Sequence, residues 1–210
     1  KGWFYVQDAA ARMAVLAGGP KAGQRVLDCC AAPGGKSFAC AIQMEDRGEV
    51  VCCDIHPHKV RLLEAGKARL GFRSLRPQLQ NAAQVRPEWL GSFDVVIADV
   101  PCSGLGIIRK KPDIRYKAAA PLAGLPKVQR EILGNNSAYV RAGGTLLYST
   151  CTLLERENEA VVEDFLSGHP DFFLESFTLP GVGESKGMLT LWPHIHGTDG
   201  FFMAKLRKRR

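Results

Sequence analysis

Short apolar runs alternate with segments of helical spacing through most of the chain, and this alternation restricts the fold more than any other feature. The runs cover residues 25–30, 49–54, 76–80, 93–99 and 144–149, and the helical segments lie near 8–17, 36–45, 57–70, 126–141 and 155–167. Repeated strand–helix units build parallel sheets, because each crossover helix covers a sheet face. The sequence therefore predicts an α/β fold with a mostly parallel, doubly wound sheet.

The pattern changes after about residue 170. Short strands are indicated around 171–177 and 200–206, with no clear helix between them, so we expect antiparallel strands that close one edge of the sheet. Helix boundaries are marked at Pro57, which suits a first helical turn, and at Gly71, which suits a helix end. The stretch 103–125, rich in Gly, Pro, Lys and Arg, is long and irregular, and such loops are usually functional.

Size and charge limit the classes of protein that fit. The 210 residues suit one domain, 1–210, and the absence of an initial methionine suggests the C-terminal part of a longer protein. No apolar stretch approaches the ~20 residues that span a bilayer, and no signal peptide opens the sequence, so we expect a soluble, cytoplasmic monomer without membrane contact. The formal charge of +7 suits a polyanionic partner, although a solvated basic tail explains it equally well.

Seven cysteines lie at positions 29, 30, 40, 52, 53, 102 and 151. The number is odd and no C-x-x-C pair occurs, so most are expected to be reduced core residues. Cys102 and Cys151 differ, because turn-forming or hydroxyl residues flank them. His194 and His196 have no matching ligand cluster, so we expect surface residues and no metal site. The aromatic residues 3–5 are expected to pack at the domain edge.

Ligands of a doubly wound sheet bind beyond the carboxyl ends of its strands. The first strand runs into "DCCAAPGGKS", residues 28–37, which permits two interpretations. A phosphate-binding loop would fit Gly35, Lys36 and Ser37 but requires glycine where Cys30 stands. A nucleoside cofactor such as S-adenosylmethionine requires an acid at the end of the second strand to bind ribose hydroxyls, and Asp54 stands there. The second interpretation is favoured.

The fourth strand leads into "ADVPCSG" and the fifth into "STCTL". If these strands are adjacent, Asp99, Cys102 and Cys151 share one cleft beside the cofactor. Two thiols near an acid indicate covalent catalysis, because a thiolate that adds to carbon 6 of a cytosine makes carbon 5 nucleophilic.

These segments resemble the RNA 5-methylcytosine methyltransferases of the RsmB/NSUN (Sun/Nop2p) family. The resemblance rests on "AAPGGK", "DVPCSGLG" and "STCT" in this order, and on "GWFYVQD" at 2–8 and "HGTDGFFMAKL" at 196–206. It covers nearly the whole chain. It implies a Rossmann-like class I methyltransferase fold, S-adenosylmethionine as cofactor, and methylation of cytosine carbon 5 in ribosomal or transfer RNA.

The resemblance also implies residue roles. Cys151 matches the nucleophile, Cys102 the cysteine that helps release the product, and Asp99 an acid near both donor and base that is expected to bond cytosine N3. Asp54 matches the ribose ligand, and Asn81 stands where many relatives have an acid on the adenine side. The donor-binding loop corresponds to Cys30, Ala31, Ala32, Pro33, Gly34, Gly35 and Lys36.

RNA is expected to approach along the basic stretch that follows Cys102, which carries Arg109, Lys110, Lys111, Arg115 and Lys117. A solvated loop is the alternative. Two other functions also remain open: a P-loop-like nucleotide-binding enzyme, and an RNA-binding module without catalytic activity. Within the methyltransferase hypothesis, Cys102 is the alternative nucleophile, since DNA cytosine methyltransferases use a Pro-Cys cysteine.

Overall fold

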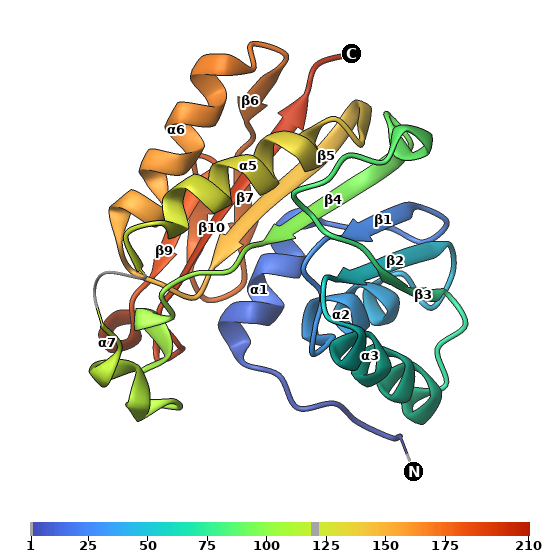
Figure 1. Cartoon of the computed structure of the whole chain (residues 1–210), viewed down its shortest axis with the longest axis horizontal. Helices are drawn as coiled ribbons and strands as arrows, with labels where there is room; N and C mark the ends of the chain where they lie inside the picture. Colours follow the sequence, from blue (N-terminus) through green and yellow to red (C-terminus); the bar gives the residue numbers. More distant parts are fainter. Residues whose placement is uncertain (1, 119–121) are drawn as a thin grey trace.

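A computed structural model describes residues 2–118 and 122–210 of the chain. Within them, a central sheet has the strand order β3-β2-β1-β4-β5-β10-β6, and β9 also pairs with β10 (Figure 1). The strands of this sheet are β1 (Arg25–Asp28), β2 (Glu49–Asp54), β3 (Leu75–Leu79), β4 (Phe93–Asp99), β5 (Val140–Thr150), β6 (Phe172–Leu174), β9 (Met188–Leu191) and β10 (Phe201–Lys208). A separate hairpin joins β7 (Phe177–Leu179) to β8 (Gly183–Ser185).

The predicted topology is confirmed. β1 to β5 pair in parallel, and β10 runs antiparallel to β5, β6 and β9. The order reverses between β1 and β4, which is the point where ligands of doubly wound sheets bind. The arrangement is a Rossmann-like, doubly wound sheet with an antiparallel edge.

Helices cover both faces of the sheet (Figure 1). They are α1 (Ala9–Gly18), α2 (Gly35–Gln43), α3 (Pro57–Leu70), α5 (Leu125–Ser137) and α6 (Glu159–Gly168), followed by the single turn α7 (Pro193–His196). Successive strand residues point to opposite faces. Val26 therefore joins the core that contains Phe38 of α2, whereas Leu27 joins the core that contains Leu133 of α5.

Helix ends follow the local sequence. The Asp8 carboxylate accepts a hydrogen bond from the Ala10 amide at 2.9 Å and so caps α1. Pro57 lies in the first turn of α3 as expected, and Gly71 ends this helix with a φ of 74°. Both predicted boundaries are thus confirmed.

Several expected boundaries were wrong. The helix expected over 126–141 ends at Ser137, because Val140 pairs with Phe93 and begins β5. The first strand ends at Asp28 rather than at residue 30, and the chain turns beyond it. The strand pair β7–β8, strand β9 and the short helix α7 were missed between 175 and 200, since each has only three or four residues.

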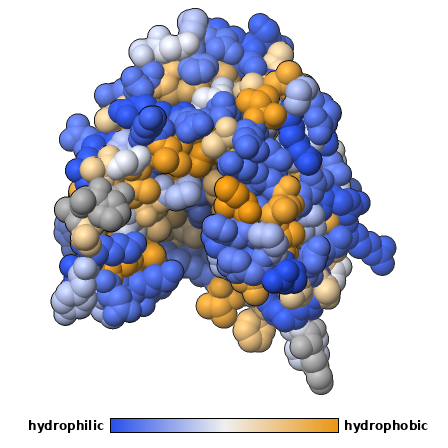
Figure 2. All heavy atoms as spheres, viewed as in Figure 1, coloured by the Kyte–Doolittle hydropathy of each residue, from blue (hydrophilic) through white to orange (hydrophobic). Residues whose placement is uncertain are grey.

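The visible surface is mainly hydrophilic with scattered apolar groups (Figure 2). Among the described residues, no helix combines the length and apolar character needed to cross a membrane. All seven cysteines are unpaired, and Cys29, Cys40, Cys52 and Cys53 are buried as expected of core thiols.

Candidate active site

A cavity of about 1090 Å³ lies at the carboxyl ends of the parallel strands. Its volume is slightly above the range of roughly 300–1,000 Å³ that small-molecule sites occupy. Residues from the ends of β1, β2, β4 and β5 and from the loop after β4 line it. Of the residues predicted for donor binding, the cavity lining includes Cys30, Ala32, Asp54, Asn81 and Asp99, and does not include Ala31, Pro33, Gly34, Gly35 or Lys36.

The loop between β1 and α2 is shaped by a glycine. Gly34 has a φ of 115°, and a Cβ on it would lie 2.3 Å from the Phe38 ring. Only glycine is therefore accommodated at the start of α2. The Ala31 amide donates to the Cys53 carbonyl at 2.7 Å, which fastens the loop to β2. The loop thus forms one wall of the cavity with little side-chain bulk.

Asp54 and Asn81 face the cavity from neighbouring strand ends. The Asp54 carboxylate accepts the His56 amide at 3.0 Å and lies 3.6 Å from the Lys59 ammonium. The Asn81 side-chain oxygen accepts the Ala83 amide at 3.0 Å, so its amide group is the part left to meet a ligand. Sequence reasoning missed the apolar lining residue Ile55, although its position directly after the strand-ending acid is a signal.

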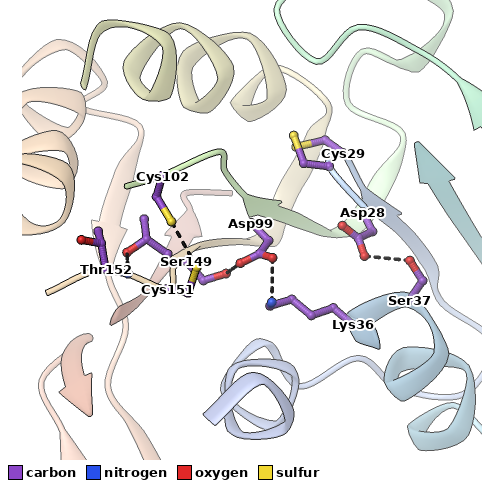
Figure 3. A network of polar contacts seen from close by, with 11 residues as sticks. Asp28, Cys29, Lys36, Ser37, Asp99, Cys102, Ser149, Cys151 and Thr152 are labelled. Atoms are coloured by element: carbon purple, nitrogen blue, oxygen red, sulfur yellow. Dashed lines mark hydrogen bonds and ion pairs between the residues drawn. The ribbon is translucent and has the colours of Figure 1, made fainter. Parts of the chain in front are cut away.

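Buried Lys36 and partly exposed Asp99 form an ion pair (Figure 3). The Lys36 ammonium donates to Asp99 Oδ2 at 2.7 Å, and the Ser149 hydroxyl donates to Asp99 Oδ1 at 2.7 Å. Burial alone would lower the pKa of Lys36, but the Asp99 carboxylate outweighs it and raises this pKa. Lys36 therefore stays protonated and also lies 4.9 Å from the centre of the Phe201 ring. Its contact with Asp99 argues against a phosphate-binding lysine.

The two predicted thiols meet in the cavity (Figure 3). Cys102 Sγ and Cys151 Sγ are 3.3 Å apart. A hydrogen bond from Cys102 lowers the pKa of Cys151, and Lys36 assists, against the effects of burial and Asp99. The same contact and burial raise the pKa of Cys102 well above its usual value. Cys151 is thus the thiol that ionises first, and Cys102 is its proton-bearing neighbour.

Main-chain contacts fix the position of Cys151. Its carbonyl accepts the Gly106 amide at 2.9 Å, and the Gly106 carbonyl accepts the Gly200 amide at 2.9 Å. A Cβ on Gly106 would lie 2.0 Å from the Gly200 carbonyl oxygen. The loops before β10 and after β4 therefore touch through backbone atoms beside the nucleophile candidate.

Asp28 is a site residue that sequence reasoning did not single out. It ends β1 completely buried, and its Oδ2 accepts the Ser37 hydroxyl at 2.7 Å (Figure 3). Its other oxygen has no hydrogen-bond partner among the described residues. Burial, opposed by the bond from Ser37, raises the pKa of Asp28 to about 6. The sequence could have identified Asp28 as a site residue because it is an acid at the end of the first strand.

The basic stretch lies partly at the cavity and partly in ion pairs. Lys111 and Lys117 line the cavity, and Arg115 is exposed. Lys110, by contrast, lies 2.6 Å from Asp8 and 2.7 Å from Asp199, while Arg109 lies 3.4 Å from Asp199. The charge of Lys110 is therefore balanced within the protein, which the sequence did not indicate.

The remaining aromatic and histidine predictions have mixed outcomes. Tyr5 packs edge-on against Phe38 with ring centres 5.1 Å apart, as expected. The expectation of packing was wrong for Phe4, which is 76% exposed, and Trp3 is 85% exposed. His194 is exposed, and the described part of the chain holds no cluster of His, Cys, Asp or Glu suited to a metal.

Comparison with known proteins identifies the family to which the chain is similar. The family model for 16S rRNA methyltransferase RsmB/F matches residues 14–207. The probable ribosomal RNA small subunit methyltransferase B of Bacillus subtilis is 39% identical in an alignment that covers 97% of this chain and 47% of the relative. The ribosomal RNA small subunit methyltransferase B of Klebsiella pneumoniae is 36% identical in an alignment that covers 100% of this chain and 48% of the relative.

Solved structures agree as well. NSun6 from Pyrococcus horikoshii, solved with SFG, has a TM-score of 0.85 and 30% identity over 100% of this chain and 54% of its own. TrmN from Thermus thermophilus, at 16% identity and a TM-score of 0.62, shares the fold. This chain spans about half the length of the curated relatives it matches. The resemblance stated from the sequence is confirmed: the chain belongs to the RsmB/F family of rRNA methyltransferases.

Proposed function

We propose that this chain is the catalytic part of an S-adenosylmethionine-dependent methyltransferase that modifies carbon 5 of a cytosine in small-subunit ribosomal RNA. The names of the relatives support the RNA class, although the chain covers only about half of their length. The pair of thiols supports carbon 5 of cytosine and a covalent route. The observation that most supports the proposal is the 3.3 Å contact between the Cys102 and Cys151 sulfurs, in which the pKa of Cys151 is lowered and that of Cys102 is raised.

The residues around the cavity fit S-adenosylmethionine. Asp54 offers a carboxylate for ribose hydroxyls, Ile55 an apolar surface for adenine, and Asn81 an amide for its ring nitrogens. Cys30 and Ala32 contribute small residues that let a ligand approach the backbone. When bound, the cofactor supplies an electrophilic methyl group.

Cys151 acts as the nucleophile in this proposal. Its thiolate adds to carbon 6 of the cytosine, which makes carbon 5 nucleophilic and places negative charge on the ring. Asp99 hydrogen-bonds ring N3, which can only accept, with a proton that the Lys36 ammonium, 2.7 Å from Asp99 Oδ2, supplies to its carboxylate, so the negative charge that develops on the ring is neutralised. Cys102 acts in the later step, where removal of the proton from carbon 5 allows Cys151 to leave. The target base must be unstacked to reach these groups.

Lys111, Arg115 and Lys117 are the cations we propose for phosphate contacts, because they are exposed and two of them line the cavity. Arg109 and Lys110 are weaker candidates for phosphate contacts, because Asp199 pairs with both and Asp8 also pairs with Lys110. Charge reversal at Lys111 and Arg115 is expected to weaken RNA binding and to flatten its salt dependence.

The proposal is tested with isotopically labelled S-adenosylmethionine and unmodified small-subunit ribosomal RNA, with transfer RNA as the comparison. Labelled 5-methylcytidine in the ribosomal RNA is the expected result. RNA that contains 5-fluorocytosine identifies the nucleophile, because the fluorine blocks release of the enzyme. We expect Cys102→Ala to form the trapped adduct and Cys151→Ala to form none; the reverse pattern refutes the assignment.

A further inference from the structure

A network of buried polar side chains connects the segments that carry the two thiols. Its members come from the loop after β4, from α5, from the end of β5 and from the turn before α6. All are at most 1% exposed: Ser103, Gln129, Thr150, Thr152, Glu157 and Asn158. Buried polar groups are costly unless they are hydrogen-bonded, so such a network holds its members in one arrangement.

Asn158 holds the residues on both sides of Cys151. The Thr150 hydroxyl donates to Asn158 Oδ1 at 2.6 Å. The Asn158 amide in turn donates to the Thr152 carbonyl at 3.1 Å. One side chain therefore holds the hydroxyl of the residue before this thiol and the backbone carbonyl of the residue after it.

Glu157 holds the other thiol in a similar way. Its Oε2 accepts the backbone amide of Ser103, which follows Cys102, at 2.9 Å. The same oxygen accepts the Gln129 amide at 2.9 Å, and Gln129 also donates to the Pro101 carbonyl at 3.0 Å. The residues on both sides of Cys102 are thus tied to Glu157.

A third contact joins the two halves of the network. The hydroxyls of Ser103 and Thr152, the residues that follow Cys102 and Cys151 in the chain, are 2.7 Å apart. The Tyr148 hydroxyl donates to the Glu157 carbonyl at 2.6 Å. This hydrogen bond fastens to β5 the turn that carries Glu157 and Asn158. Two adjacent residues of this turn therefore hold the two thiols: Glu157 holds Cys102, and Asn158 holds Cys151.

We infer that Glu157 and Asn158 are positioning residues that together set the separation of the Cys102 and Cys151 sulfurs. Asn158 orients Cys151 for addition, and Glu157 with Gln129 orients Cys102 for release. This inference rests on the proposed function in so far as the thiols act on RNA. Neither side chain lines the cavity, so each acts through the cysteine it holds.

Alkylation of the thiols tests the inference without RNA. Iodoacetamide is applied from pH 6 to 10, and the modification of Cys151 is followed by peptide mass spectrometry. Thr150→Val keeps the side-chain shape but removes the donor to Asn158, and the contact with Cys102 should loosen. The pH midpoint for Cys151 should rise by about one unit, which lowers its reaction near pH 7 about tenfold. Thr150→Ser, which keeps the hydroxyl, should restore the wild-type midpoint.

Asn158→Ala should give the same shift as Thr150→Val. A role confined to stability would lower the unfolding temperature of both variants and leave the Cys151 midpoint unchanged, and that result overturns the inference. If Asn158→Ala fails to bind the donor analogue sinefungin and is therefore misfolded, the comparison of Thr150→Val with Thr150→Ser tests the inference by itself.

Trapping on 5-fluorocytosine RNA separates this inference from the proposed function. If the wild-type protein forms no adduct, the proposed function is refuted. The pH midpoints of Cys151 alkylation still test whether Glu157 and Asn158 position the thiols. If wild type forms the adduct, Asn158→Ala should form it at least about tenfold more slowly, because small displacements of a reacting group are costly. On ordinary cytosine RNA, Glu157→Ala should accumulate the covalent complex and Glu157→Gln, which keeps an acceptor oxygen, should not. Equal behaviour of the two Glu157 variants overturns the role of this residue.

Discussion

Asp28 ends β1 with a completely buried carboxyl group, and its replacement by asparagine is expected to stabilise the protein at neutral pH. Burial raises its pKa from 3.8 to about 6 in the folded state. At about 1.4 kcal/mol per pKa unit, this shift of roughly 2 units corresponds to about 3 kcal/mol. Ionisation of Asp28 therefore costs the folded state about 3 kcal/mol.

The sign of this effect fixes its pH dependence. A carboxyl whose pKa is raised by folding contributes its full stability below the unfolded value of 3.8, and this contribution is lost as the pH rises through about 6. Asp28→Asn does not titrate and keeps an oxygen for the Ser37 hydroxyl. The free energy of unfolding of Asp28→Asn relative to wild type should therefore grow by about 3 kcal/mol between roughly pH 4 and pH 7.

Urea unfolding at pH 4 and pH 7 measures this difference. Asp46→Asn is the matched control, because hydrogen bonds from Ser74 and Arg73 outweigh partial burial and lower the pKa of Asp46. A lowered pKa gives stability that is present above 3.8 and lost in acid, so this variant should become relatively less stable as the pH rises. A stability difference for Asp28→Asn that is equal at both pH values would refute the reasoning.

Two further predictions concern the thiols and the loop beside them. Cys102→Ala removes the hydrogen bond that lowers the pKa of Cys151, so the pH midpoint for alkylation of Cys151 should rise; an unchanged midpoint would contradict the assigned contact. Gly106→Ala brings a Cβ to 2.0 Å from the Gly200 carbonyl oxygen and should cost at least about 2 kcal/mol in thermal unfolding. Gly134→Ala, in a part of α5 with open space, should be neutral or stabilising by up to about 1 kcal/mol, and similar losses for both would argue against the close contact.

The sheet and the meeting of the thiols were predictable because they depend on local periodicity and on one general rule. Apolar runs of strand length identify β4 and β5, and adjacent parallel strands bring their carboxyl ends to the same edge. Asp99, Cys102 and Cys151 therefore had to converge. Their detailed relation did not follow, because it depends on rotamers and on turns that several segments impose together.

Pairing of charges over long sequence distances was not predictable. Lys36 binds Asp99, which is 63 residues away, and Lys110 binds Asp8 at a separation of 102. A count of basic residues treats Lys110 as available for phosphate, whereas Asp8 and Asp199 neutralise it. Charge totals are informative only once the fold has determined which charges are already paired.

The buried network was hidden for a related reason. Glu157 and Asn158 read as the polar start of a helix, and nothing in the local sequence shows that their side chains turn inward. Their burial arises because Ser103, Gln129 and the end of β5 supply hydrogen-bond partners from three separate segments.

The contact between Gly106 and Gly200 has a consequence for changing the preference of such an enzyme for its RNA. Because these loops meet through main-chain atoms, and Gly106 in turn binds the Cys151 carbonyl, this contact with Cys151 does not depend on the exposed side chains of the loops. Under the proposed function, an outward-facing residue such as Tyr116 can be exchanged to suit another nucleotide sequence while this main-chain contact stays in place. Chemistry and selectivity are thereby separable, and libraries varied on the loop surface should retain the catalytic step more often than libraries that alter loop length.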